Sequence, residues 1–406
     1  MKLTPSISKR NFYSLLWHAG FLAIAQNFID VDTIIPAMMV DAGGTAIHIG
    51  ILTAIMLGGS SFTQLIFAPF ISNYFFKKKF LLLGINSRMV ALLVLGIILY
   101  YSSMFEGNYE IILIFLLITI FSLGGAFANI SYTDILGKSL LKESRKTFLS
   151  IKQVVTGIIL VSSVFAARYV LSIEHYPINY SYMFFIGFIA LSVASLGFWN
   201  LKEVVPSKMQ VKGPHHFFQI VKSELKQNKK LGYFLGFINT MGISTALLPF
   251  IILYAKDFIN LQSENTGNYL LFKVMGAVFA GLLLFSLSGK FKYRYLLYLN
   301  TGLAIVIPSF ILLLPGIPPF YLVFFIGGII FASYSVTMNG VLLEVSGTSN
   351  RALYTGIAGA GTILPALFPL LGGWIIQEFG FQPFFILFMA IILSSLFFIF
   401  KINCKK

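Results

Sequence analysis

The stretch Asn27-Phe-Ile-Asp-Val-Asp-Thr-Ile-Ile-Pro36 places two carboxylates, Asp30 and Asp32, inside an apolar segment that runs from about residue 12 to residue 39. An ionised carboxylate is costly in hydrocarbon, so such residues face a protein interior or a wet cavity and usually serve function. The stretch therefore predicts a membrane-spanning helix in a protein that moves a solute.

The composition also predicts an integral membrane protein. Hydrophobic residues make up 57% of the 406 and charged residues 11%, against about 25% charged in soluble domains. A soluble fold could not hide that much apolar surface, because even large domains leave much of their surface in water. The first apolar segment is too long for the core of a signal peptide, so we expect a retained helix. The single cysteine, Cys404, excludes an intramolecular disulfide.

A spanning helix needs about 20 mostly apolar residues, and polar or Gly/Pro-rich breaks separate the candidates. The sequence predicts twelve of them, at about 12–39, 47–74, 80–102, 110–137, 147–171, 181–201, 230–256, 266–289, 294–314, 319–345, 352–377 and 381–401. The fold class expected is therefore all-α, with twelve transmembrane helices in two pseudo-symmetric six-helix bundles. The bundles are residues 1–201 and 230–406, joined by a basic linker, 202–229, that could form an amphipathic helix on the membrane surface.

Positive charge predicts the orientation. All Lys and Arg residues fall on one side of this map except Arg88, Lys152, Arg168, Lys256 and Lys273. Because cytoplasmic loops carry the excess of Lys and Arg, we expect both termini and the linker in the cytoplasm and the protein in the cytoplasmic (inner) membrane. The net charge of +15 then reflects topology, and we expect no nucleic-acid partner.

The two halves repeat each other. Asn129, Asp134 and Gly137 near the end of the fourth span recur 210 residues later as Asn339, Glu344 and Gly347. The segment from residue 32 to 36 in the first span likewise matches 245 to 249 in the seventh, where Thr replaces the first acid. Such duplication is how many secondary transporters build a site between repeats.

At this point the chain resembles the major facilitator superfamily over essentially its whole length. The family's loop between spans two and three has the pattern Gly-x-x-x-Asp-Arg-x-Gly-Arg/Lys-Arg/Lys, and the matching stretch here is Pro69-Phe-Ile-Ser-Asn-Tyr-Phe-Phe-Lys-Lys78. Only the basic end is kept. The resemblance implies alternating access, with Asp134 where members often place an acidic partner of that loop.

Site residues follow from polar groups within the spans. Asp30 and Asp32 are the proton-coupling candidates, about 200° apart on a continuous helix, with Asp30 slightly favoured. Lys273 lies too deep in its span to reach the surface easily, so it is the expected distant partner of these acids. The substrate-cavity candidates are Gln26, Asn27, Gln64, Asn129, Tyr132, Asn239, Thr245, Lys273, Tyr334 and Asn339, although such groups also hydrogen-bond helices together. The cytoplasmic-gate candidates are Asp134, Arg145, Glu344, Arg351, Lys77 and Lys78.

Two further intramembrane cations have structural interpretations. Arg88 is expected in an ion pair near the inner leaflet, because the third span is usually peripheral in this fold. Lys152 either faces the acids or extends towards the membrane surface.

The chain has no complete Gly-x-x-x-x-Gly-Lys-Ser/Thr phosphate loop, because Tyr132 stands where Gly137-Lys138-Ser139 would need its first glycine. It also has no evident nucleophile, metal-ligand cluster or cofactor motif, so an enzyme is not expected. The predicted function is secondary active transport of a small organic solute by a monomer in the lipid bilayer, with the proton coupling that the family resemblance implies. Two alternatives stay open: a cation or metal carrier that uses Asp30 and Asp32 as ligands, and a non-transporting receptor or assembly factor on the same fold. The substrate itself is not predicted.

Overall fold

The structure is a computed structural model. It describes residues 3–72, 74–104, 109–207, 214–259, 263–286, 292–313, 320–346, 357–359 and 361–402, and all of these lie in helices, turns or connecting segments. Each of the twelve predicted spans contains a described helix. The predicted all-α fold is therefore confirmed.

The first predicted span is two helices. α1 (Pro5–Phe28) ends just before the acids, and α2 (Ile34–Asp41) begins just after them. Pro36 is the third residue of α2. Proline is tolerated there because the first N–H groups of a helix have no carbonyl partner within the helix. The 200° separation expected for a continuous helix is therefore wrong, because Asp30 and Asp32 lie in the non-helical break.

The second half repeats this break with the same spacing. Adding 213 to Phe28, the last residue of α1, and to Ile34, the first of α2, gives the end of α9 (Lys229–Met241) and the start of α10 (Leu247–Ile259). The 3-10 helix η2 (Gly242–Ala246) fills the gap, and a proline again stands third in the helix that follows. The repeat read from the sequence is thus also a repeat of backbone geometry.

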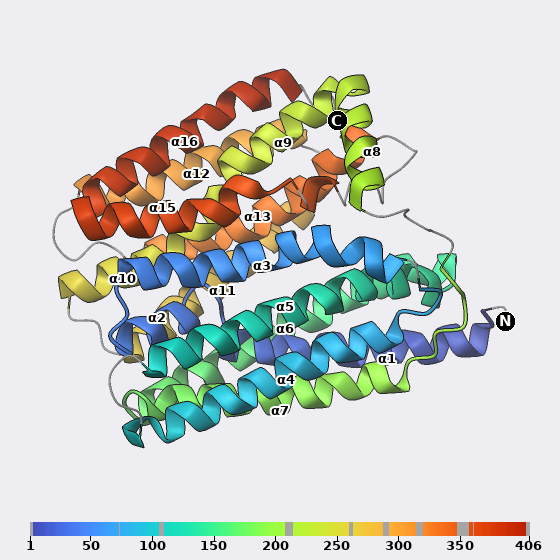
Figure 1. Ribbon diagram of the computed structural model, residues 1–406, viewed down its shortest axis with the longest axis horizontal. Helices are drawn as coiled ribbons and strands as arrows, with labels where there is room; N and C mark the ends of the chain where they lie inside the picture. The colour runs from blue at the N-terminus through green and yellow to red at the C-terminus, as the bar shows by residue number, and fades with distance from the viewer. Residues whose placement is uncertain are drawn as a thin grey trace. The chain divides into compact units, whose positions relative to one another are not determined.

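The chain divides into two compact units, residues 1–30 with 62–218 and residues 31–61 with 219–406. The long helix α3 (Ala46–Ser72) continues from one unit into the other. In the first unit, α4 (Lys78–Tyr100), α5 (Tyr109–Ser139) and α7 (Ile178–Asn200) run side by side, as Figure 1 shows, while α6 (Lys142–Ile173) packs on α1. The short 3-10 turn η1 (Ser102–Met104) follows α4.

Glycines let helices of the first unit approach closely. A Cβ added to Gly84 of α4 would lie 2.5 Å from the carbonyl oxygen of Gly124 in α5, closer than any real side chain allows. This contact fixes α4 against α5 and matters below, because Arg88 lies one turn further along α4.

In the second unit, helix α11 (Ser263–Ser286) packs on α13 (Phe320–Ser346), and α12 (Tyr293–Leu313) packs on both α13 and α16 (Phe381–Ile402). α15 (Ile363–Phe379) contacts η2 and α16. The linker carries a helix, α8 (Pro214–Gln227), where the sequence allowed one. The predicted division of the chain into residues 1–201 and 230–406, joined by the linker 202–229, stays a prediction.

Ten helices of the described chain are long and apolar enough to cross a membrane. The predicted spans outside this set are the first, which the break divides, and the second, whose described apolar part, Ala46–Gly59, is shorter. Twelve transmembrane segments are therefore consistent with the structure once the broken first helix is taken as one span.

Candidate functional site

The second unit contains a buried ion pair between the α1–α2 break and helix α11. The Nζ of Lys273 lies 2.5 Å from Oδ2 of Asp32, and the two residues are only 6% and 7% exposed. Lys273 also lies 5.5 Å from the centre of the Phe331 ring, within range of a cation–π contact. The structure thus brings the deepest predicted cation against one of the two predicted acids.

A small cavity adjoins this pair. Its volume is about 20 Å³, room for about one water molecule. Asp32, Ser244 and Thr245 line it, together with apolar side chains from α10, α12 and α13. The Thr245 hydroxyl donates to the Gly242 carbonyl oxygen at 2.7 Å, whereas Oγ of Ser244 is buried and has no hydrogen-bond partner among the described residues. The two repeated breaks therefore both supply polar atoms to one cavity.

Two more contacts hold residues 31–61 within the second unit. Asp41, the last residue of α2, forms an ion pair with Lys256 of α10. Gly50 of α3 lies against α15, where an added Cβ would be 2.4 Å from the Pro369 carbonyl oxygen. Residues 31–61 are thus held in the second unit by two ion pairs and the close contact of Gly50.

Asp30 lies elsewhere. It falls in the first unit, whereas Asp32 falls in the second, because the division runs between Asp30 and Val31. Asp30 is half-buried and does interact with another group. The buried lysine of this pair contacts Asp32, and the slight preference for Asp30 as the cavity-facing acid stays a prediction.

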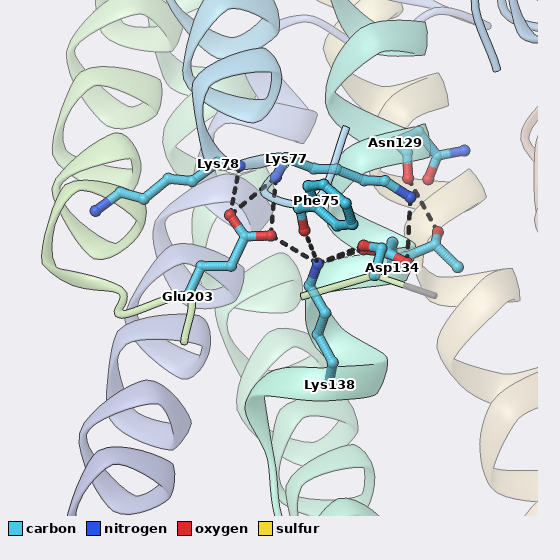
Figure 2. Close-up of polar contacts among 9 residues, drawn as sticks. Phe75, Lys77, Lys78, Asn129, Asp134, Lys138 and Glu203 are labelled. Carbon is cyan, nitrogen blue, oxygen red and sulfur yellow. Dashed lines mark hydrogen bonds and ion pairs between the residues drawn. The ribbon is translucent and has the colours of Figure 1, made fainter. Parts of the chain in front are cut away.

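A second polar network lies in the first unit, where α4 begins and α5 ends (Figure 2). Asp134 accepts from Lys77 at 3.2 Å and from Lys138 at 2.7 Å. Lys138 also reaches Glu203 at 2.7 Å, and Ser207 donates to Asp134 at 2.7 Å. The expected contact of Asp134 with the basic loop is present, although the loop keeps only the basic end of the family pattern.

Glu203 is the residue of this network that the sequence analysis missed. Its carboxylate accepts the backbone N–H groups of Lys77 and Lys78 at 2.7–2.9 Å and so caps the N-terminus of α4. Nζ of Lys78 in turn donates to the carbonyl oxygens of Trp199 and Leu201 at the end of α7. The sequence signal that could have identified Glu203 is an acid in a basic linker, two residues after the end of a predicted span.

Several predicted cavity residues have structural roles. Asn27 donates to Leu160 and Ser163 of α6 at 2.7 and 2.8 Å. Asn239 accepts the N–H groups of Ile363 and Leu364, the first residues of α15. These amides join helices, which was the alternative reading of such groups.

The remaining candidates are scattered. Gln26, Asn129 and Asn339 are exposed, and the Asn339 amide donates to its own helix. Tyr132 and Tyr334 are half-buried. Arg145 donates from Nε to the Leu140 carbonyl oxygen, and Glu344 is half-buried in α13. The Gln64 side chain and Arg351 lie outside the described residues.

Arg88 departs from expectation. Its guanidinium lies 4.1 Å from the centre of the Phe121 ring of α5, and in the described part of the chain no carboxylate lies within ion-pair distance of it. The expected ion pair is therefore wrong for the residues described. His18, by contrast, is simply packed: it stacks on Phe198 at 3.7 Å and contacts the Ala194 carbonyl oxygen.

The described residues contain no group of three His, Cys, Asp or Glu side chains placed to hold a metal ion. The polar chemistry of the site thus consists of ion pairs, amides and hydroxyls.

The sequence profile of the Major Facilitator Superfamily matches residues 16–362. No protein curated for its function matches the sequence significantly.

Solved structures share the fold at low sequence identity. The nucleoside transporter NupG is 13% identical with a TM-score of 0.70, over 97% of this chain and 100% of that chain. A POT family transporter in complex with a thioalcohol conjugated peptide is 12% identical with a TM-score of 0.69, over 97% of each chain. The xylose transporter XylE from E. coli is 13% identical with a TM-score of 0.64, over 96% of each. The chain is therefore a multi-pass integral membrane protein that belongs to the major facilitator superfamily of transporters.

Proposed function

We propose that this protein is a secondary active transporter that moves a small organic solute by alternating access, coupled to protons through Asp32. The observation that carries the proposal is the buried ion pair of Asp32 with Lys273 beside a polar cavity. A buried pair of this kind contributes little net stability, because desolvation offsets the attraction. Its presence in the membrane interior is therefore best explained by function.

Protonation of Asp32 is the coupling step. A proton on the carboxylate removes the charge that holds Lys273, so the 2.5 Å contact loses most of its attraction. Of the three contacts that hold residues 31–61 in the second unit, the Asp41–Lys256 pair and the Gly50 contact then remain. Its release from α10, α11 and α15 opens the solute path, and loss of the proton restores the pair.

The network around Asp134 acts as the cytoplasmic gate, in addition to the Asp32–Lys273 pair. Lys77, Lys138 and Glu203 link the start of α4 to the end of α5 and the start of the linker. Breaking these links lets the bundles, residues 1–201 and 230–406, rock about the central site while the linker keeps them joined. The protein acts as a monomer.

Transport in proteoliposomes tests the coupling. A thermal-shift screen of purified protein first identifies a solute, since a ligand that binds the folded state stabilises it. An imposed pH gradient should then drive accumulation of that solute, and Asp32→Asn should abolish the gradient's effect while Asp257→Asn, an exposed carboxylate on α10, should not. Full gradient-driven accumulation by Asp32→Asn would contradict the assignment.

The natural cysteine tests the orientation without any substitution. We place both termini in the cytoplasm, with the protein in the inner membrane, from the distribution of Lys and Arg. Cys404 is the single cysteine of the chain. A membrane-impermeant maleimide should label it only after cells are permeabilised, and labelling of intact cells would reverse the topology.

A further inference from the structure

Two cations lie deep in the helices of the first unit. Arg88 and Lys152 each follow the first residue of their helix, Lys78 and Lys142, by ten positions, which is about 15 Å along the axis. Neither side chain donates a hydrogen bond to any described residue, and neither has a described carboxylate within ion-pair distance. Charge in this setting is costly unless something compensates it.

Packing against α5, and not an ion pair with a described residue, holds the Arg88 side chain in place. Its aliphatic stem crosses Gly124 and Gly125, where added Cβ atoms would lie 3.0 Å from Cγ and 3.8 Å from Cζ. Nε is buried without a hydrogen-bond partner in the described chain. The only specific contact of the guanidinium there is the Phe121 ring at 4.1 Å. A rigid donor group is thus kept in place with part of its hydrogen-bonding capacity unused.

Lys152 and Tyr132 lie together. Nζ of Lys152 is 5.6 Å from the centre of the Tyr132 ring, whose hydroxyl donates no hydrogen bond to a described residue. The Tyr132 ring is 6.4 Å from the ring of His18. Tyr132 also follows Gly125, against which Arg88 packs, by seven positions, which places both on one face of α5. The two cations and the phenol therefore lie along one face of α5.

An apolar groove runs along the same face of α6. Its volume is about 350 Å³, and α1 and α6 form its walls with Trp17, Gly20, Val155 and Ile159 among them. Lys152 precedes Val155 by three positions and Ile159 by seven, a spacing that puts all three on one side of a helix. The groove therefore has apolar walls, and Lys152 lies on the same side of α6 about one turn before Val155.

We propose that Arg88, Lys152 and the Tyr132 hydroxyl form a subsite for the anionic group of the solute, whose apolar body occupies the groove between α1 and α6. The solute class is an organic anion with an apolar body, such as an aromatic carboxylate. The anion supplies the charge that the described residues do not, and its oxygens accept from guanidinium, ammonium and phenol. The assignment rests on the proposed transport function, since it names that function's substrate class.

Binding to purified protein in detergent tests the subsite without a gradient. Benzoate is the probe, benzamide its uncharged analogue and inorganic phosphate an anion without an apolar body. Benzoate should raise Tm progressively with concentration, benzamide should not, and Arg88→Gln and Lys152→Gln should each abolish the benzoate effect. Arg168→Gln, which removes a cation from the far part of α6, is the matched control and should keep it.

Other outcomes overturn the proposal. Equal stabilisation by benzoate and benzamide would refute the anion site, equal stabilisation by benzoate and phosphate would refute the groove, and no effect of benzoate would refute both. Ligand-free Lys152→Met should have a higher Tm than the wild type, because a site kept for function carries an uncompensated charge; a lower Tm would indicate a structural lysine. Asp32→Asn should still bind benzoate, so failure of proton coupling and failure of this subsite are distinguishable.

Discussion

Replacing Lys273 by methionine isolates the charge at the centre of the proposed mechanism. Methionine keeps an unbranched apolar stem but removes the ammonium that lies 2.5 Å from the Asp32 carboxylate. That carboxylate stays 7% exposed in the wild-type structure, so water cannot readily replace the lost charge. The variant should therefore be less stable than the wild type.

The size of the loss can be bounded. Two unit charges 2.5 Å apart attract by ~7 kcal/mol at an effective dielectric constant of about 20, and desolvation cancels much of this. Removing one member of a buried pair typically costs about 3–5 kcal/mol. Proton uptake by the carboxyl group sets a ceiling, because protonating an ordinary carboxyl of pKa about 3.9 at pH 7 costs ~4 kcal/mol. We expect a destabilisation of about 3–4 kcal/mol at pH 7.

The sign of the pH dependence follows from the same reasoning. A folded Lys273→Met protein that keeps a proton on Asp32 binds more protons than its unfolded chain at any pH above about 4. Its stability therefore falls as pH rises, by about 1.4 kcal/mol per unit, and recovers as pH is lowered.

Equilibrium unfolding in sodium dodecyl sulfate, followed by tryptophan fluorescence, measures these differences. The double variant Asp32→Asn/Lys273→Met removes both charges and should recover most of the stability lost by Lys273→Met alone. If the double variant is as unstable as Lys273→Met, or if Lys273→Met matches the wild type, the two charges do not compensate each other and the reasoning fails.

Three further substitutions test packing and capping. Gly50→Ala should destabilise the protein by about 1–3 kcal/mol, because its Cβ would meet the Pro369 carbonyl oxygen at 2.4 Å; unchanged SDS unfolding would show that α3 and α15 do not touch there. Glu203→Ala should cost about 1–3 kcal/mol by leaving the N–H groups of Lys77 and Lys78 without their carboxylate, and Glu203→Gln should recover part of this loss in the same assay. Asn239→Ala should lower stability by about 1 kcal/mol through loss of the α15 cap, which a Tm equal to the wild type would contradict.

The helices and the repeat could be predicted because hydropathy records them directly. Long apolar runs need a membrane, and the charged breaks between them set their ends. The match of residues 32–36 with 245–249 also paired the two regions where the structure has helix breaks. The full break at 29–33 was not predicted, because hydropathy is the same for a helix and for a turn made of these residues.

The contacts of the sites were harder to predict. Lys273 was singled out because a lysine so deep in a span is unusual, but which acid it faces depends on the break that separates Asp30 from Asp32. Glu203 was missed because its partners are backbone N–H groups at the start of α4, and a sequence does not show which acid caps which helix. Arg88 was assigned an ion pair because its span is usually peripheral in this fold, whereas its surroundings depend on glycines of a neighbouring helix.

Because the two helix breaks have equal length, the segment around one break could replace the segment around the other. Residues 242–249 stand 213 positions after residues 29–36, and each segment begins just after a helix and carries a proline at its end. A chimera with 242–249 in place of 29–36 would keep the length of the chain and the position of the proline while removing both carboxylates at once. Under the proposed mechanism, this single exchange within the reading frame would convert a proton-driven carrier into a passive one.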